Sequence, residues 1–298
     1  MSIRVNPNIL PDLLAGLNQA RQQLNQADLE LASGRSINQP SDNPAGTSAL
    51  ILNHAAQSQT DSYQQNVSDL QSKLQIADSS LNSAVTVIDQ AISLGVEAGN
   101  GTLSDGDRQA IAQQLSGIQQ QLVGIGNTTA GGTYLFGGTQ VETAPFTVNS
   151  AAAAGVTYNG NSSVTSVQIA NGQSVNVNVP GDQLFLNPSG SVLGSINQLI
   201  TAVQNNSGIS AAVTALGQAS NEFDTQRLSY GTALNELQTT GTFLTNEQLQ
   251  LSTQETNIDG ADIAQVATQF SQAQIAYASL LEAETKILNQ PNILSLLQ

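Results

Sequence analysis

Apolar side chains recur every seven positions near the N-terminus. Four leucines are spaced by seven: Leu10, Leu17, Leu24 and Leu31. Three positions after the first three of them stand Leu13, Ala20 and Ala27. Such a repeat is typical of a helix that packs through one apolar seam, as in a coiled coil. The spacing predicts a first helix that ends at the break formed by Ser33 and Gly34.

A second tract contains no proline from residue 45 to residue 144 and carries a longer seam. Proline in a helix interior costs about 3 kcal/mol, so a tract without it can form long helices. A helix over residues 45–98 would be about 80 Å long. Residues 99–101 end this helix, Ser104 can cap the next one, and the chain can then fold back antiparallel. The two seams are Val67, Leu70, Leu74, Ala77, Leu81, Ala84, Ile88 and Ala91, then Ile111, Leu115, Ile118, Leu122 and Ile125.

The C-terminal third repeats the seven-residue pattern, and a phase shift near Gly260 divides it. The members before the shift are Leu216, Phe223, Tyr230, Leu237, Leu244, Leu251 and Ile258. The members after it are Ile263, Phe270 and Tyr277 with Val266, Ala273, Leu280 and Ile287. Helices are therefore expected at both ends of the chain and on both sides of its middle.

The middle of the chain has the pattern of short strands. Apolar and polar residues alternate from Thr165 to Ile169 and again from Val175 to Val179, with Asn171 and Gly172 between the two runs. This arrangement predicts a β-hairpin with a type I′ turn, in which both central residues have positive φ. The same region holds five of the eleven aromatic residues: Tyr134, Phe136, Phe146, Tyr158 and Phe185. We expect a β module inserted at the tip of a helical stalk.

These elements predict a mainly α protein with an inserted β domain, in which long antiparallel helices form a coiled-coil-like stalk and the terminal helices pair. The expected parts are terminal polymerisation segments at 1–43 and 259–298, a helical stalk at 44–130 and 192–258, and the β domain at 131–191. Burying a leucine contributes about 1.5–3 kcal/mol, and ordering a residue costs about 1–2 kcal/mol. The thin terminal seams are therefore expected to become ordered against partners.

Composition excludes several classes of function. The net charge is −15 and the few basic residues are dispersed, which disfavours nucleic acid and anionic membrane surfaces as partners. The chain has no cysteine and one histidine, His54, so disulfides, thiolate sites and histidine-rich metal sites are not expected. Apolar runs fall short of the roughly 20 residues that span a bilayer, and we expect no ordinary signal peptide.

Candidate catalytic groups have simpler structural explanations. Asp105 and Asp107, and likewise Asp259 and Asp262, are expected at helix N-terminal ends, where the macrodipole favours carboxylates. His54 is expected to be a solvated or capping residue. The glycine pairs at 131–132 and 137–138 lack the strand-to-helix order and the lysine of a phosphate loop, so they predict tight backbone bends. We expect no catalytic residues, cofactor or metal.

Three motifs resemble the flagellin-type axial proteins of the bacterial flagellum. Residues 31–46 (LASGRSINQPSDNPAG) resemble the signature after their first helix, and residues 99–107 (GNGTLSDGD) are similar to the turn between their first two core helices. Residues 259–264 and 292–297 resemble parts of their final helix. Residues 130–139 (AGGTYLFGGT) and the β region at 156–185 are similar to the hook-filament junction branch of the family, whereas the ending at 292–297 is closer to filament flagellins.

The resemblance implies a structural, non-enzymatic subunit that joins the hook side to the flagellin filament and is needed for motility. Its implied partners are the first hook-associated protein, flagellin, other copies of itself in a tubular assembly, the flagellar type III export apparatus, and an export chaperone at the C-terminal helix. The implied location is extracellular, without a cleaved signal peptide. The predicted assembly seam comprises Leu10, Leu13, Leu17, Leu24, Leu31, Ile263, Val266, Phe270, Tyr277, Leu280 and Ile287.

Two alternatives remain open at this point. The first is a filament flagellin, which belongs to the same family and shares its helices. The second is a secreted adhesin or surface protein that carries its activity on the β domain at 131–190, although the sequence offers that domain no nucleophile or acid pair.

Overall fold

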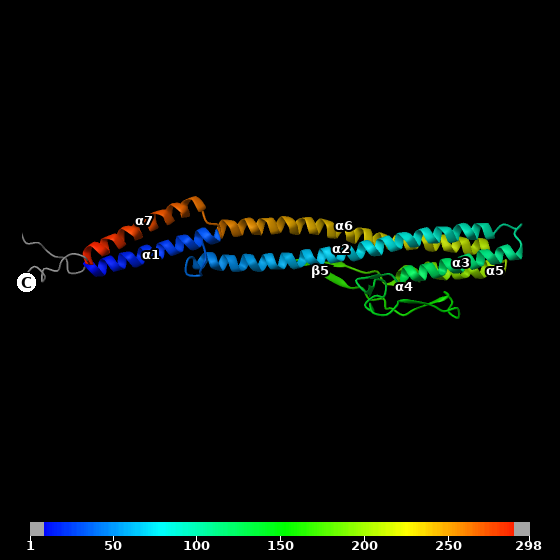
Figure 1. Cartoon of the computed structure of the whole chain (residues 1–298). Helices are drawn as coiled ribbons and strands as arrows, with labels where there is room; N and C mark the ends of the chain where they lie inside the picture. Colours follow the sequence, from blue (N-terminus) through cyan, green and yellow to red (C-terminus); the bar gives the residue numbers. More distant parts are fainter. Residues whose placement is uncertain (1–8, 289–298) are drawn as a thin grey trace, which may run out of the picture. The chain divides into compact units, whose positions relative to one another are not determined.

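The computed structural model describes residues 9–288, with side chains described from residue 11 to residue 286. Its helices are α1 (Ile9–Ser33), α2 (Pro44–Ala98), α3 (Asp105–Gly126), α4 (Gly181–Phe185), α5 (Val192–Gln204), α6 (Ile209–Asp259) and α7 (Ile263–Leu288) (Figure 1). The strands are β1 (Thr129–Ala130), β2 (Thr133–Tyr134), β3 (Phe146–Val148), β4 (Val156–Tyr158), β5 (Ser166–Ala170) and β6 (Gln173–Asn176). They pair antiparallel as β1 with β2, β3 with β4, and β5 with β6. The mainly helical class with a small β module in the middle is confirmed.

The chain packs as two compact units. Unit 1 contains the described residues up to Ser58 and from Gln248 onward, and unit 2 is Gln59–Glu247. Helices α2 and α6 contribute residues to both units. The predicted division into terminal segments, stalk and β domain assigns functions to parts of these units, and it stays a prediction.

Helix α2 follows the predicted long element closely. Pro44 stands at its first position, where a missing N–H and a fixed φ are tolerated, and the backbone N–H of Gly46 donates to Asn43 Oδ1 over 2.9 Å. The helix continues for 55 residues because no proline or strongly polar face interrupts its seam. It ends at the glycine turn that follows Ala98, where the N–H of Gly99 donates to the carbonyl of Gly95.

Helices α2 and α6 run antiparallel in unit 2. Arg227 Nε on α6 lies 2.9 Å from Asp78 Oδ1 on α2. Farther along α2, Gly95 approaches α6 so closely that a Cβ there would lie 2.6 Å from Val213 Cγ2. The two seams face one core, whose buried members include Val67, Leu70, Leu74, Ala77, Leu81, Ala84, Ile88, Ala91, Leu216, Phe223, Tyr230, Leu237 and Leu244. Within residues 9–288, none of the helices combines the length and the apolar character that a membrane crossing requires.

Helix α3 begins with the cap that the sequence predicts. The side chain of Ser104 accepts from the N–H of Asp107, and the Asp107 carboxylate accepts from the N–H of Ser104, which completes a capping box. The hydrogen bonds from Ser104 hold the pKa of Asp107 below its ordinary value. The prediction that Asp105 and Asp107 lie at a helix N-terminus is confirmed.

The hairpin of β5 and β6 is confirmed, but its predicted turn type is wrong. Gly172 has a φ of 73°, whereas Asn171 does not have a positive φ, so a type I′ turn is excluded. The register shifts between Gln168 and Ala170, which adds a residue to β5 before the turn. This irregularity supplies local strand twist that a type I′ turn would otherwise provide.

The position of the β module also differs from the prediction. The side chain of Asn66 on α2 donates to the carbonyl of Gln168, and Gln173 at the start of β6 donates to Glu236 on α6. The hairpin therefore lies along the sides of α2 and α6, not at the tip where α2 turns into α3. Heptad patterns identify which helical face is apolar but not which stretch of that face receives an insertion.

Aromatic rings form the centre of the β module. The ring of Phe185 contacts those of Phe136, Phe146 and Phe223, with centroid distances of 5.8, 5.3 and 5.3 Å. Phe223 belongs to α6, so the same cluster attaches the module to the helices. The hydroxyl of Tyr158 donates to the carbonyl of Phe136 over 2.9 Å, and burial raises the pKa of Tyr158 to about 12.

Alanine substitutions at two glycines of unit 2 are expected to change its stability in opposite directions. Gly138 has a φ of 70°, and a Cβ there would collide with the carbonyl oxygen of Asn161. Gly138→Ala is expected to destabilise unit 2 by about 1–3 kcal/mol or more. Gly117→Ala in α3 meets no atom within 4 Å, and it should stabilise the helix by about 0.5–1 kcal/mol. Urea unfolding of both variants measures the change in the free energy of unfolding. Changes of the same sign in the two variants would contradict the prediction.

Candidate assembly site

The terminal helices α1 and α7 pack side by side in unit 1 (Figure 1). A Cβ at Gly16 near the start of α1 would lie 3.7 Å from Leu280 Cδ2 near the end of α7, so the two helices run antiparallel. Gly16 has no side chain, and this leaves room for the leucine. The predicted pairing of the terminal helices is confirmed.

The predicted assembly seam divides into three groups by exposure. Val266 is the buried member, and the alanines of the same heptad series, Ala20, Ala27 and Ala273, are buried beside it. The half-buried members are Leu13, Leu17, Leu24, Phe270, Tyr277 and Leu280. The exposed members are Leu31 and Ile263, and the side chains of Leu10 and Ile287 lie outside the described residues. The pair thus buries a narrow stripe and leaves several seam side chains partly exposed, while their role in assembly stays a prediction.

Unit 1 also exposes apolar side chains outside the seam. The largest exposed fractions are 73% for Leu52 on α2 and 68% for Ile275 on α7. Further exposed members of this set are Leu14, Leu29, Ile51, Leu249 and Leu281. Single exposed leucines are ordinary on a protein surface, but a unit of this size with so many has apolar surface available for other subunits.

The two connections between the terminal pair and the long helices contact each other. After α1, Gly34 has a φ of 69°, and its carbonyl accepts from the N–H of Ala261 over 3.1 Å. The N–H of Ser36 donates to the carbonyl of Asp259 over 2.6 Å. These bonds form a short antiparallel bridge between Arg35 and Gly260. The break at Ser33–Gly34 and the phase shift near Gly260 therefore meet in space.

Asp259 is the buried carboxylate of this connection, and its predicted setting is wrong. It is the last residue of α6, so it stands at the C-terminal end of a helix, where the macrodipole disfavours a negative charge. Its side chain accepts from the N–H of Ile37 over 2.8 Å and lies 3.3 Å from Arg35 Nε. These tertiary partners stabilise the charge in place of a helix N-terminus. The prediction for Asp262 is confirmed, because its Oδ1 accepts from the N–H groups of Ala264 and Gln265 at the start of α7.

A second carboxylate, Glu255, lies one turn earlier on α6 and binds three side chains. Gln57 Nε2 donates to it over 2.8 Å, His54 Nε2 lies 2.9 Å away, and Arg35 Nη2 lies 3.3 Å away. The hydrogen bonds from Gln57 and His54 hold the pKa of Glu255 below its ordinary value. His54 is exposed on α2, as predicted for a solvated residue, and its Nε2 contacts Glu255. Nearby, buried Asn53 donates to the carbonyl of Leu251.

The lowered pKa of Glu255 predicts an acid-sensitive contact. A carboxyl group whose pKa is lowered by folding stabilises the folded state above its unfolded pKa of about 4.5, and this stabilisation is lost as pH falls through the folded pKa. The protection factors of amides in unit 1, which correct for the intrinsic pH dependence of exchange, should therefore fall below about pH 4.5. Glu255→Gln should lower protection at pH 7 and flatten this pH dependence. A pH profile that is the same in both proteins would contradict the prediction.

Sequence reasoning missed the partners of this polar cluster. Arg35 falls inside the motif at 31–46, but nothing in its local pattern identifies residues more than 200 positions away as its partners. Asn53 and Gln57 give a weak signal, because they stand four residues apart on a helix whose buried face is mostly apolar, and Gln57 donates to Asn53 Oδ1 over 2.7 Å.

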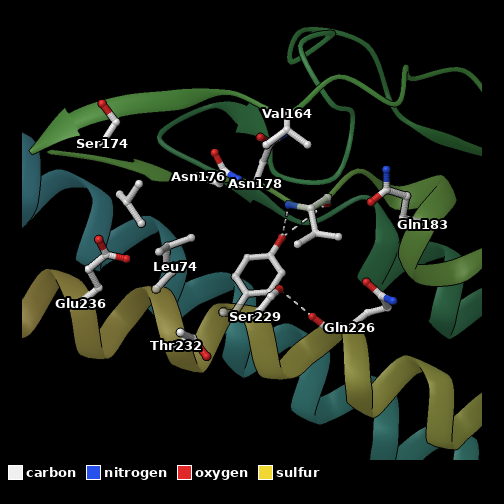
Figure 2. Close-up of a pocket in the computed structure, with 14 residues that line it drawn as sticks. Leu74, Val164, Ser174, Asn176, Asn178, Gln183, Gln226, Ser229, Thr232 and Glu236 are labelled. Atoms are coloured by element: carbon white, nitrogen blue, oxygen red, sulfur yellow. Dashed lines mark hydrogen bonds between the residues drawn. The ribbon is translucent and has the colours of Figure 1, made fainter. Parts of the chain in front are cut away.

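Unit 2 holds a groove of about 580 Å³ between the β5–β6 hairpin and α6 (Figure 2). Amide, hydroxyl and apolar side chains line it, among them Leu74, Val164, Asn176, Gln183, Gln226 and Glu236. The phenol oxygen of Tyr230, one of the lining residues, accepts from the N–H of Val179, and burial raises the pKa of Tyr230. Tyr230 thus joins the segment that follows β6 to α6.

Comparisons with known proteins agree with the arrangement of the helices. Residues 8–141 match the bacterial flagellin N-terminal helical region, and residues 213–297 match the bacterial flagellin C-terminal helical region. Flagellar hook-associated protein 3 of Salmonella typhimurium is 28% identical over 311 aligned residues, which cover 96% of this chain and 95% of that protein. Flagellin A of Vibrio anguillarum is 31% identical over 140 residues, which cover 46% of this chain and 37% of that protein.

A solved structure extends this agreement to the fold. The crystal structure of FlgL from Xanthomonas campestris matches with a TM-score of 0.59 at 18% identity, covering 68% of this chain and 98% of that chain. The two proteins therefore share a fold. Because its N-terminal and C-terminal regions match the two helical regions of flagellin in their proper order, the chain belongs to the bacterial flagellin family of flagellar axial proteins.

Proposed function

We propose that this chain is a structural subunit of the bacterial flagellum that joins the hook side to the flagellin filament. The observation that carries the proposal is the extent of the similarity. The match to flagellar hook-associated protein 3 covers 96% of the chain, including the β module, whereas the match to Flagellin A covers 46%. A junction subunit therefore accounts for the helices and the middle of the chain together.

The proposed role of each part of the subunit is assigned from its exposed and buried surfaces. The terminal segments at 1–43 and 259–298 are the proposed polymerisation elements, since the pair of α1 and α7 exposes apolar side chains. The part of the proposed stalk, at 44–130 and 192–258, that lies in unit 2 has a buried core between Val67 and Leu244, which supports a stalk that holds its shape without partners. The β domain at 131–191 is the proposed outward-facing part. Catalysis has no place in this function.

The proposed partners are those of a junction. The first hook-associated protein would contact the subunit on the hook side and flagellin on the filament side, with further copies of this chain completing a tube. Export through the flagellar type III apparatus would deliver the chain to the cell exterior. The proposed binding element for an export chaperone is α7, whose exposed apolar side chains include Ile275 and Leu281.

Deletion of the chain tests the junction directly. Cells that lack it are expected to keep a hook, to release unpolymerised flagellin into the medium, and to lose swimming motility. Electron microscopy of the cell surface and immunoblotting of the medium measure these outcomes. Filaments of normal length on the deletion strain would overturn the proposal.

Seeded polymerisation separates the junction from the flagellin alternative. Purified protein mixed with filament fragments should cap or bind their ends without extending them, because a junction subunit forms a short segment. Extension into long filaments would identify the chain as a filament flagellin instead.

A further inference from the structure

We propose that Asp259, Arg35 and Glu255 form a clasp that positions the terminal helix pair for assembly. These positioning residues would make the ordering of the N-terminal helix depend on the arrival of the C-terminal segment. The inference rests on the proposed function for its assembly role, and on the contacts of unit 1 alone for its structural role.

The first step is the source of the hydrogen bonds for the segment after α1. Gly34 accepts from Ala261, Ser36 donates to the carbonyl of Asp259, and Ile37 donates to the side chain of Asp259. Partners for this segment thus come from residues more than 200 positions later in the chain. Ser36 and Ile37 are half-buried, and their N–H groups find these partners only when the C-terminal segment is in place, which favours ordering of the two segments together.

The second step is the charge of Asp259. Its side chain is 5% exposed, at the end of a helix that offers it no favourable dipole. A charge in such a place is retained only where other groups compensate for its lost hydration. The N–H of Ile37 and the guanidinium of Arg35 do so, and both belong to the segment that the clasp orders.

The third step is the bridging geometry of Arg35. Its Nε lies 3.3 Å from Asp259 Oδ2 and its Nη2 lies 3.3 Å from Glu255 Oε1, so one side chain reaches two carboxylates one turn apart on α6. Glu255 in turn binds Gln57 and His54 on α2. The clasp therefore joins the connection after α1 to the α2 and α6 segments of unit 1. A planar guanidinium suits this double contact better than an ammonium group does.

Side-chain packing reinforces the clasp. A Cβ at Gly46 near the start of α2 would lie 2.6 Å from Ile37 Cδ1, so the side chain of Ile37 rests against the backbone of α2. The same residue thus donates its N–H to Asp259 and places its side chain on the next helix. The segment after α1 is held by charge, backbone and packing at once.

The test measures hydrogen exchange of the Ile37 amide in the full-length protein and the incorporation of each variant into flagella. Asp259→Ala removes the acceptor of Ile37 and the partner of Arg35, so exchange at Ile37 should accelerate by about tenfold to a hundredfold, and cells producing it should lose most filaments. Asp259→Asn keeps an acceptor oxygen without the charge and should have an intermediate effect. Arg35→Gln should lower incorporation, and Arg35→Lys should restore part of it.

Asp78→Asn provides the matched control. It removes a carboxylate that lies 2.9 Å from an arginine in unit 2, with no backbone partner from a distant segment. Exchange at Ile37 and flagellar incorporation should stay at the wild-type level. Unchanged exchange at Ile37 in Asp259→Ala would overturn the clasp.

The two proposals fail in different ways. Accelerated exchange with normal incorporation would overturn the assembly role of the clasp and keep its structural role. If deletion of the whole chain left filaments intact, the proposed junction function would be wrong, whereas the exchange result for Asp259→Ala would stand.

Discussion

Leu17→Asp and Leu280→Asp are expected to abolish incorporation into the flagellum while unit 2 stays folded. Both leucines are half-buried in the α1–α7 pair, and the Leu280 side chain lies against Gly16. A carboxylate in such a seam is partly removed from water, which costs about 1–3 kcal/mol or more. The apolar seam between α1 and α7 is narrow, so it offers few contacts that could offset this cost. Swimming assays and electron microscopy of cells producing each variant measure the result.

Asn18→Asp is the control for the introduced charge. Asn18 is exposed on α1 next to Leu17, so the variant adds the same charge to the same helix outside the seam. It should swim as the wild type does. Circular dichroism and urea unfolding should show an intact unit 2 in all three variants. Normal motility of either leucine variant would count against the assembly seam.

Heptad patterns predicted the long helices well, because they report the physics that forms them. The seam from Val67 to Ala91 is buried throughout its length, since α2 finds α6 as an antiparallel partner with matching periodicity. The capping box at Ser104 followed from local rules as well, because its two partners are three residues apart. Features whose causes lie within one or two turns of chain are readable from sequence alone.

Other features depend on contacts that no local pattern encodes. The Asp259 carboxylate looked like a helix-start residue, yet its partners come from the segment after α1. The hairpin turn looked like type I′, yet an irregularity in β5 and a positive φ at Gly172 give another geometry. In both cases tertiary structure overrides a local preference, which is expected where distant segments must meet.

Phe185→Ala is expected to cause the largest loss of stability in unit 2. Its side chain is fully buried and its ring contacts Phe136 and Phe146 in the β module and Phe223 on α6. Truncation to alanine removes these contacts and leaves a cavity, which costs about 3–5 kcal/mol for a buried phenylalanine. Urea unfolding followed by near-ultraviolet circular dichroism measures the change, with Tyr158 and Tyr230 as probes within unit 2.

Phe243→Ala separates cavity formation from the loss of an aromatic ring as such. Phe243 lies on α6 with 58% of its surface exposed, so its truncation creates no cavity and should change stability by about 0.5 kcal/mol or less. Equal effects of the two variants would contradict the assignment of the core to Phe185. Hydrogen exchange distinguishes a local from a global effect of Phe185→Ala. If the variant loosened only the β module, exchange would rise around Tyr158 and stay low around Leu81. The seam between α2 and α6 would then hold without the aromatic cluster.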